Sequence, residues 1–143
     1  MLMHKPMTEC FEYQHTVMAD EIDEQGHANN VVFVAWMQAA AIAHTKALGW
    51  TSEQYKRLGA GWVARSHTIE YLLPAFAGDK LIVRTWVASM KKVTSVRQYH
   101  IFRESDRQVL AKAETNWAFV DYKTGKPTRI PAEIIDLYKV SDR

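Results

Sequence analysis

The sequence contains a single cysteine, Cys10, so the chain cannot form an intramolecular disulfide or a zinc site built from cysteines. It also lacks a strong excess of charge of one sign, because 18 Lys and Arg residues nearly balance 16 Asp and Glu residues. The resulting net charge of +2, with both signs interspersed, is too small to indicate nucleic-acid binding.

Long hydrophobic runs are missing as well. The longest, Val31 to Ala43, is interrupted by Gln38 and is too short to cross a bilayer. The N-terminal residues MLMHKPMTEC have no apolar core of the kind that signal sequences carry. We therefore expect a cytoplasmic protein that has no contact with a membrane.

The composition is typical of one globular domain. Hydrophobic residues make up 48% of the chain and charged residues 24%, which is the balance of a folded protein rather than a disordered one. A length of 143 residues is enough for one hydrophobic core. We expect a single domain that covers residues 1–143.

The hydrophobic pattern predicts one strand and one long helix in the first third of the chain. Residues 11–17 alternate apolar and polar side chains, which indicates a strand. A helix is predicted from Asn29 or Asn30 to the stop signal at Gly49. Its first three turns are apolar almost all the way round, so we expect this helix to be buried on most sides.

The remainder of the chain is predicted to be mostly strands. Four β-rich segments, residues 62–73, 79–90, 93–104 and 109–122, are separated by turn signals. A short surface helix over residues 52–61 precedes them, and Pro131 opens a short helix after them. One long helix across one face of an antiparallel sheet is an α+β architecture. A five-stranded curved sheet wrapped around such a helix is the hotdog fold.

The segment EIDEQGHANNVV, residues 21–32, places acids, a glycine, a histidine and two amides directly before the long helix. An Asn at its start is a natural N-cap, and the first backbone N–H groups of the helix then point outward without partners. The helix dipole makes this end suitable for a developing oxyanion. With the Asp23 carboxylate close by, the segment has the minimum groups for acyl hydrolysis, although acids before a helix are also common for purely structural reasons.

The pattern Asp-x-x-Gly-His-x-Asn-Asn before a buried helix resembles the hotdog thioesterases of the 4-hydroxybenzoyl-CoA thioesterase family. The resemblance extends through VARSHTIEYLLPAFAGDKLIVRTWV and DYKTGKPTRIPAEI, and so covers most of the chain. It implies that Asp23 is the catalytic carboxylate and that the backbone N–H of Asn30, with Val31 as a second candidate donor, polarises the thioester carbonyl. It assigns to His27 and Asn29 the positioning of the loop or of a water molecule.

The same residues also resemble a motif of plant acyl-carrier-protein thioesterases, which implies joint roles for Asp23, Gln25 and His27. The chain departs from the family patterns at Gln25 and Asn30, and also at Glu21, where many members have an aspartate. Another hotdog branch carries its carboxylate inside the long helix. Residues 31–48 contain no Asp or Glu, so that branch is excluded.

Two groups of basic residues are candidates for binding the phosphates of coenzyme A. Lys91 and Lys92 lie in a predicted turn between two strands, and Lys126 and Arg129 follow the last strand. The alternative is that these are ordinary solvated turn residues. Six histidines form no His-x3-His pair or Cys/His cluster, and no G-x-S-x-G motif is present, so we expect no metal, no Ser-His-Asp triad and no tightly bound cofactor.

The function that these features predict is hydrolysis of an acyl-CoA thioester to a free carboxylic acid and coenzyme A, with Asp23 as nucleophile or general base. Three alternatives stay open: an acyl-carrier-protein thioesterase, a hotdog hydratase or dehydratase, and a non-catalytic acyl-CoA-binding protein. The resemblance also implies a homodimer, often paired into a homotetramer, with active sites at the subunit interface.

Overall fold

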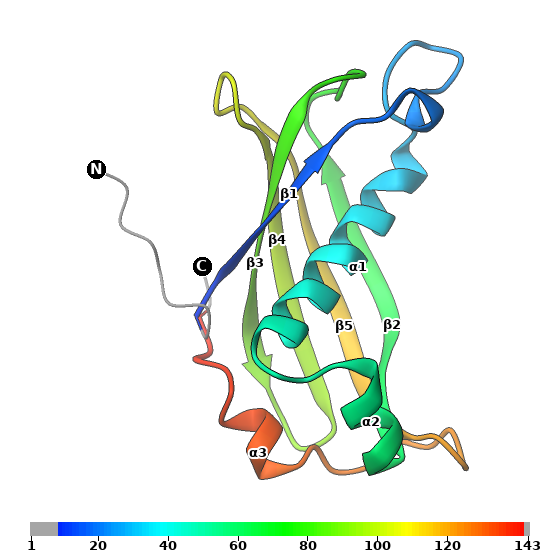
Figure 1. Cartoon of the computed structure of the whole chain (residues 1–143), viewed down its shortest axis with the longest axis vertical. Coiled ribbons are helices and arrows are strands. Elements are labelled where there is room, and N and C mark those ends of the chain that lie inside the picture. Colours follow the sequence, from blue (N-terminus) through cyan, green and yellow to red (C-terminus); the bar gives the residue numbers. More distant parts are fainter. Residues whose placement is uncertain (1–8, 142–143) are drawn as a thin grey trace.

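The computed structural model describes residues 9–141 as a five-stranded antiparallel sheet that curves around one long helix (Figure 1). The strands are β1 (Phe11–Thr16), β2 (Ala60–Tyr71), β3 (Lys80–Met90), β4 (Thr94–Arg103) and β5 (Val109–Asp121). The helices are α1 (Asn30–Ala47), α2 (Ser52–Leu58) and α3 (Ala132–Ile135), with a 3-10 turn at Ala19–Glu21. The order in the sheet is β1-β3-β4-β5-β2, which confirms the predicted hotdog architecture.

Strand alternation places one face of the sheet against α1. In β1 the half-buried and exposed residues alternate without exception, as the sequence predicted. In β4 the buried face carries Ser95, Arg97, Tyr99 and Ile101. A charged residue in that row is unusual, because Tyr99 and Ile101 on the same face belong to the apolar core.

Helix α1 begins at the predicted position. Asn29 is the N-cap, and its side-chain oxygen accepts a hydrogen bond from the Val31 N–H at 3.0 Å. The face toward the sheet is fully packed, with Phe33, Trp36 and Met37 at most 2% exposed. Burying each such side chain contributes about 1.5–3 kcal/mol.

The expectation that α1 is buried on most sides is met on the sheet side and wrong on the opposite side. Val31 is 73% exposed and Ile42 is 65% exposed, and Ala35 and Gln38 are exposed on the same face. The helix is apolar almost all round, but a single five-stranded sheet has area to cover only one side of it. The apolar pattern of the sequence therefore extends to a side of α1 that the sheet of the same chain does not cover.

The fold separates two ends of the molecule. The chain leaves β1 beside the start of β3, since Thr16 pairs with Lys80, and enters the loop before α1 there. Strand β3 then runs 11 residues, about 35 Å, to the opposite end, where α2 and α3 lie (Figure 1). A second core cluster, which includes Phe119, Ile130 and Ile134, packs at that end.

The terminal helix is shorter than the residues 131–140 that the sequence predicted. Only Ala132–Ile135 is helical, and the Leu137 N–H then bonds to Ile134 O at 3.1 Å, which tightens the chain into a turn. Within residues 9–141 no single helix has the length and hydropathy of a membrane span. The pair α1 and α2 reaches that length and composition when taken together, with a 75° bend between them.

Candidate functional site

The segment between the 3-10 turn and α1 is a compact loop closed by its own backbone. The Asp23 N–H donates to His27 O at 2.9 Å, and the Gly26 N–H donates to Asp23 O at 3.1 Å. Gly26 has φ +87°, a left-handed conformation that glycine adopts without strain. The Ala28 N–H donates to Ala75 O at 2.7 Å and so ties the loop to the connection between β2 and β3. These bonds hold Asp23 opposite His27, immediately before the first turn of α1.

The Asp23 carboxylate is partly exposed and only partly engaged. Its Oδ1 accepts the Gln25 N–H at 2.9 Å, while its Oδ2 lies 3.8 Å from His27 Nδ1, beyond hydrogen-bond distance. His27 Nδ1 is closer to Ala28 O, at 3.3 Å. The Asp23 side chain is 26% exposed and that of His27 is 32% exposed. The structure therefore brings Asp23 and His27 together, and Oδ2 of the partly exposed carboxylate makes no hydrogen bond to the described residues.

The start of α1 offers one free backbone donor rather than two. The Val31 N–H donates to the Asn29 side-chain oxygen at 3.0 Å, so the second candidate oxyanion donor already has an acceptor in the helix cap. The Asn30 N–H has no acceptor among the described residues, as expected for the first turn of a helix. Tyr71 on β2 donates its hydroxyl to Asn30 O at 2.9 Å and so fixes this turn against the sheet.

Glu21 anchors the loop, a role that the sequence did not reveal. Its carboxylate accepts three hydrogen bonds, from His15 Nε2 at 2.8 Å, the Met18 N–H at 2.9 Å and Trp36 Nε1 at 2.8 Å. Its carbonyl oxygen accepts the Asn29 N–H at 2.9 Å. Partial burial acts to raise the pKa of Glu21, but these hydrogen bonds outweigh it and hold the pKa below its usual value. One residue thus joins β1, the loop and α1.

The predicted basic residues lie at the other end of the molecule from Asp23. Lys91 and Lys92 are exposed in the turn after β3. Arg129 is exposed after β5, and the N–H of the following residue, Ile130, donates to Lys92 O at 2.8 Å. The structure therefore brings Lys92 and Arg129 into one neighbourhood, but about the length of β3 away from the Asp23 loop of the same chain.

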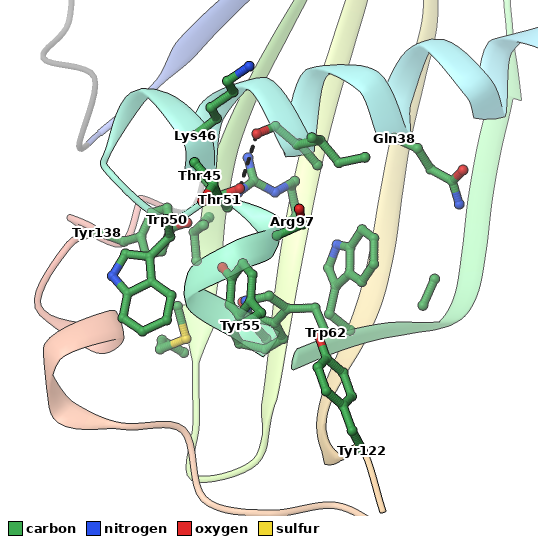
Figure 2. Close-up of a pocket in the computed structure, with 18 residues that line it drawn as sticks. Gln38, Thr45, Lys46, Trp50, Thr51, Tyr55, Trp62, Arg97, Tyr122 and Tyr138 are labelled. Atoms are coloured by element: carbon green, nitrogen blue, oxygen red, sulfur yellow. Dashed lines mark hydrogen bonds between the residues drawn. The ribbon is translucent and has the colours of Figure 1, made fainter. Parts of the chain in front are cut away.

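A cavity of about 640 Å³ also opens at that end, between the C-terminal half of α1, α2 and the sheet (Figure 2). Trp50 and Trp62 line it, whereas Trp36 does not, because its indole is turned to Glu21. The cavity also contains a buried cation, Arg97. The sequence held one signal for this residue, since Arg97 shares a strand face with Tyr99 and Ile101.

His44 and His67 have structural partners. His44 is fully buried and its Nδ1 lies 2.9 Å from Arg97 Nη1, and His67 Nδ1 lies 2.8 Å from Thr115 Oγ1. In the part of the chain that the structure describes, no group of three or more His, Cys, Asp or Glu residues is placed to hold a metal ion.

Comparison with known proteins identifies the family. Residues 17–137 match the thioesterase-like superfamily, which is most of the chain. The chain belongs to this superfamily. The resemblance that the residues 21–32 indicated is thereby confirmed, and the chain is a thioester hydrolase of the hotdog fold.

Some relatives of the chain are named as acyl-carrier-protein thioesterases and others as acyl-CoA thioesterases. The chain is 25% identical over 130 residues to acyl-acyl carrier protein thioesterase ATL3 of Arabidopsis thaliana, covering 91% of this chain and 68% of that protein. It is 24% identical over 132 residues to acyl-CoA thioester hydrolase YbgC of Escherichia coli O6:H1, covering 92% and 98%. It spans 60% and 32% of two further plant acyl-carrier-protein thioesterases, from Arabidopsis thaliana and Cuphea viscosissima.

The fold of the superfamily is also found in solved structures. A 1,4-dihydroxy-2-naphthoyl-CoA thioesterase from Synechocystis superposes with a TM-score of 0.83 at 19% identity, over 90% of this chain and 94% of that one. At this identity the likeness shows the fold.

Proposed function

We propose that this member of the thioesterase-like superfamily hydrolyses acyl-CoA thioesters at the loop before α1, with Asp23 as the reactive carboxylate. The observation that carries the proposal is a partly exposed Asp23 carboxylate in the loop directly before an 18-residue helix, whose Asn30 N–H has no acceptor among the described residues. The first group supplies negative charge for attack or for activating water, and the second supplies a donor for the oxyanion.

In the proposed reaction, water replaces the thiol on the acyl carbon. Asp23 either attacks the carbonyl to form a mixed anhydride that water then cleaves, or removes a proton from the attacking water. Both routes develop negative charge on the carbonyl oxygen, which the Asn30 N–H and the positive end of the α1 dipole stabilise. His27, 3.8 Å from Asp23, orients the loop or the water.

The carrier of the acyl group is tested by direct comparison. YbgC is named for acyl-CoA and ATL3 for acyl-carrier-protein substrates, and each supports one carrier. We propose coenzyme A because YbgC is matched over nearly its whole length. Release of free thiol would be measured with matched acyl-CoA and acyl-carrier-protein thioesters of short, long and aromatic acids. A kcat/KM that is higher for the carrier-protein thioesters throughout would overturn the choice.

We also propose that the chain acts as at least a homodimer. Strand β2 is an edge of the sheet and is 12 residues long, and long unprotected edges normally pair or are covered. The exposed apolar face of α1, which includes Val31 and Ile42, needs covering as well. Pairing two β2 strands antiparallel would join two sheets and bring the opposite ends of two molecules together. The Lys92 and Arg129 neighbourhood of one subunit would then lie toward the partner's Asp23.

Light scattering tests the assembly. At micromolar concentration we expect a mass of at least twice the 16.5 kDa of one chain. Replacing Val63 on the β2 edge with Lys places a charge where natural edge strands carry one to prevent pairing, so Val63→Lys should raise the monomer fraction and lower activity with it. Val140→Lys, at a similarly exposed position outside the sheet, is the control. A fully active monomer would contradict the proposal.

The basic turn is proposed to hold the phosphates of coenzyme A. Replacing both Lys91 and Lys92 with Ala should raise KM for acyl-CoA and weaken its salt dependence, because two charges that face phosphate are lost. The kcat should change little, since these contacts are remote from the reacting carbon. Arg129→Ala should act in the same direction. An unchanged KM in both variants, the double lysine variant and Arg129→Ala, would make these residues ordinary solvated turn residues.

A further inference from the structure

The cavity at the α2 end of the molecule is lined by charge of one sign. Its lining includes Lys46 and Arg97 and contains no Asp or Glu. Six of the lining residues are aromatic, among them Trp50, Trp62 and Trp117. A volume of about 640 Å³ lies within the usual range for small-molecule sites, about 300–1,000 Å³. The cavity therefore has the size and the apolar walls of a ligand site, with positive charge alone.

Arg97 is a buried cation that has no carboxylate partner within residues 9–141. It is 4% exposed, and its Nη1 donates to His44 Nδ1 at 2.9 Å and to Thr85 Oγ1 at 3.1 Å. Because an arginine N–H can only donate, His44 Nδ1 accepts and the imidazole is neutral. The ring of Tyr138 lies 5.9 Å from the Arg97 guanidinium carbon. No Asp or Glu in residues 9–141 forms an ion pair with Arg97, so the cost of burying this charge is not offset by a carboxylate of the chain.

Two further donors beside the cavity have no acceptor. Among the described residues, three buried side-chain polar atoms make no hydrogen bond, and two of them, Tyr55 Oη and Trp117 Nε1, belong to the cavity lining. Buried polar atoms normally make a hydrogen bond, so two unsatisfied donors in one cavity wall require an explanation. Thr45 and Trp62 lie near Tyr55, and Tyr99 lies near Trp117, but none is in hydrogen-bond geometry with these atoms. Burial raises the pKa of Tyr55, so its hydroxyl is protonated and can donate at neutral pH.

We propose that this cavity binds an organic carboxylate with an aromatic or alkyl body, the carboxylate facing Arg97 and the body lying against the tryptophan walls. The two bonds to His44 and Thr85 both come from Nη1. The Tyr138 hydroxyl also lies near Arg97 but is not in hydrogen-bond geometry with it, so among the described residues the donors on Nε and Nη2 stay available for a planar carboxylate. Tyr55 and Trp117 supply further donors, and Figure 2 shows Arg97, Tyr55 and Trp62 at the same space between α1, α2 and the sheet. This site lies at the end of the molecule opposite the Asp23 loop of the same chain, and it stands whether or not Asp23 is the reactive group.

The indole N–H signals of the five tryptophans give a direct readout by NMR. We would titrate ¹⁵N-labelled protein with benzoate and octanoate, and with the neutral isosteres benzamide and octanamide. The Trp117 Nε1–H signal, assigned with Trp117→Phe, should shift saturably with the carboxylates. Trp36 and Trp86 are internal controls, since their indoles donate to Glu21 and Gln98 and lie outside the cavity lining, so their signals should stay in place.

Paired substitutions identify the charge that matters. Arg97→Met should lower the carboxylate affinity about 10- to 100-fold, the range that a hydrogen bond to an ionised group supplies. Arg57→Met removes the same charge from a side chain that is 77% exposed on α2, and should leave the affinity unchanged. Tyr55→Phe deletes a hydroxyl that has no hydrogen bond in the structure, so it should keep the fold and lower the affinity about 2- to 10-fold. If Arg97→Met does not fold, the Tyr55→Phe variant still tests whether the cavity binds the carboxylate.

The proposal would be overturned by any of three results. These are no saturable shift of Trp117 up to about 10 mM carboxylate, equal binding of carboxylates and amides, or an unchanged affinity in both Arg97→Met and Tyr55→Phe. To determine whether the natural ligand is the reaction product, we would measure how benzoate inhibits thioester hydrolysis. Competition with acyl-CoA would identify the carboxylate as the acid that the reaction releases, and an unchanged KM would identify a separate ligand.

Discussion

Asp23→Asn should lower kcat about 10²–10⁴-fold, the usual contribution of a general base or acid, while KM moves much less. The amide keeps the shape of the carboxylate, and its oxygen can still accept the Gln25 N–H that Asp23 Oδ1 accepts at 2.9 Å. What is lost is the negative charge on Oδ2, which attack on the thioester and activation of water both require. The Asn30 N–H stays in place, so substrate should still bind.

The neighbouring acid provides the matched control for this experiment. Glu24→Gln removes the same charge one residue along, from an exposed side chain, and should leave kcat within a few-fold of the parent enzyme. His27→Ala should cost less than Asp23→Asn, because His27 Nδ1 lies 3.8 Å from Asp23 and is assigned to positioning. Near-normal turnover in Asp23→Asn, together with loss of activity in His27→Ala, would make His27 the base.

Glu21→Ala should destabilise the fold by roughly 3 kcal/mol, because three donors lose an ionised acceptor and bonds of this kind contribute about 1.5–3 kcal/mol each without adding fully. Trp36 Nε1 is left without its partner inside the core, since Trp36 is 2% exposed. The loop that carries Asp23 would lose its attachment to β1 and α1. We therefore also expect kcat to fall about 10- to 100-fold through misplacement of Asp23.

Denaturant unfolding and initial rates would measure these two effects separately. Asp20→Ala, an exposed acid beside Glu21, is the control for the change in net charge and should alter stability by less than about 0.5 kcal/mol. In the double variant Glu21→Ala/Trp36→Phe the stability loss should be smaller than the sum of the single losses, because both changes remove the same bond. Exact additivity would show that the Trp36 bond is not what Glu21 contributes.

The contribution of Glu21 should also depend on pH in one direction. Its folded-state pKa lies below the ordinary value of 4.5, because the hydrogen bonds from Met18, His15 and Trp36 outweigh the effect of burial. A lowered pKa gives stability that is complete above the unfolded-state pKa and is lost as the pH falls through the folded-state pKa. The stability difference between the parent protein and Glu21→Ala should be constant near neutral pH and shrink below about pH 4.5.

Much of the fold is determined locally and could be predicted from the sequence. The alternation in residues 11–17 predicted β1 because side chains in a strand alternate between faces whatever lies next to them. An N-cap at Asn29 or Asn30 was predicted because such a side chain satisfies a backbone N–H two residues away, and the structure selects Asn29. The placement of Asp23 directly before a helix start is also a property of adjacent residues.

The tertiary structure decided the features that join distant residues. Glu21 and Trp36 are 15 residues apart, and only the packing of α1 beside the loop makes one the acceptor for the other. Arg97 stood in a strand pattern as an ordinary charged residue, and its burial against His44, 53 residues away, depends on how α1 crosses the sheet. The exposed side of α1 has the same origin, since its sequence is apolar almost all round and one sheet covers only one side. Hydrogen bonds between residues close in sequence follow from the order of the residues. The burial of a side chain and the charged groups near it depend instead on which distant segments pack against it in the folded chain.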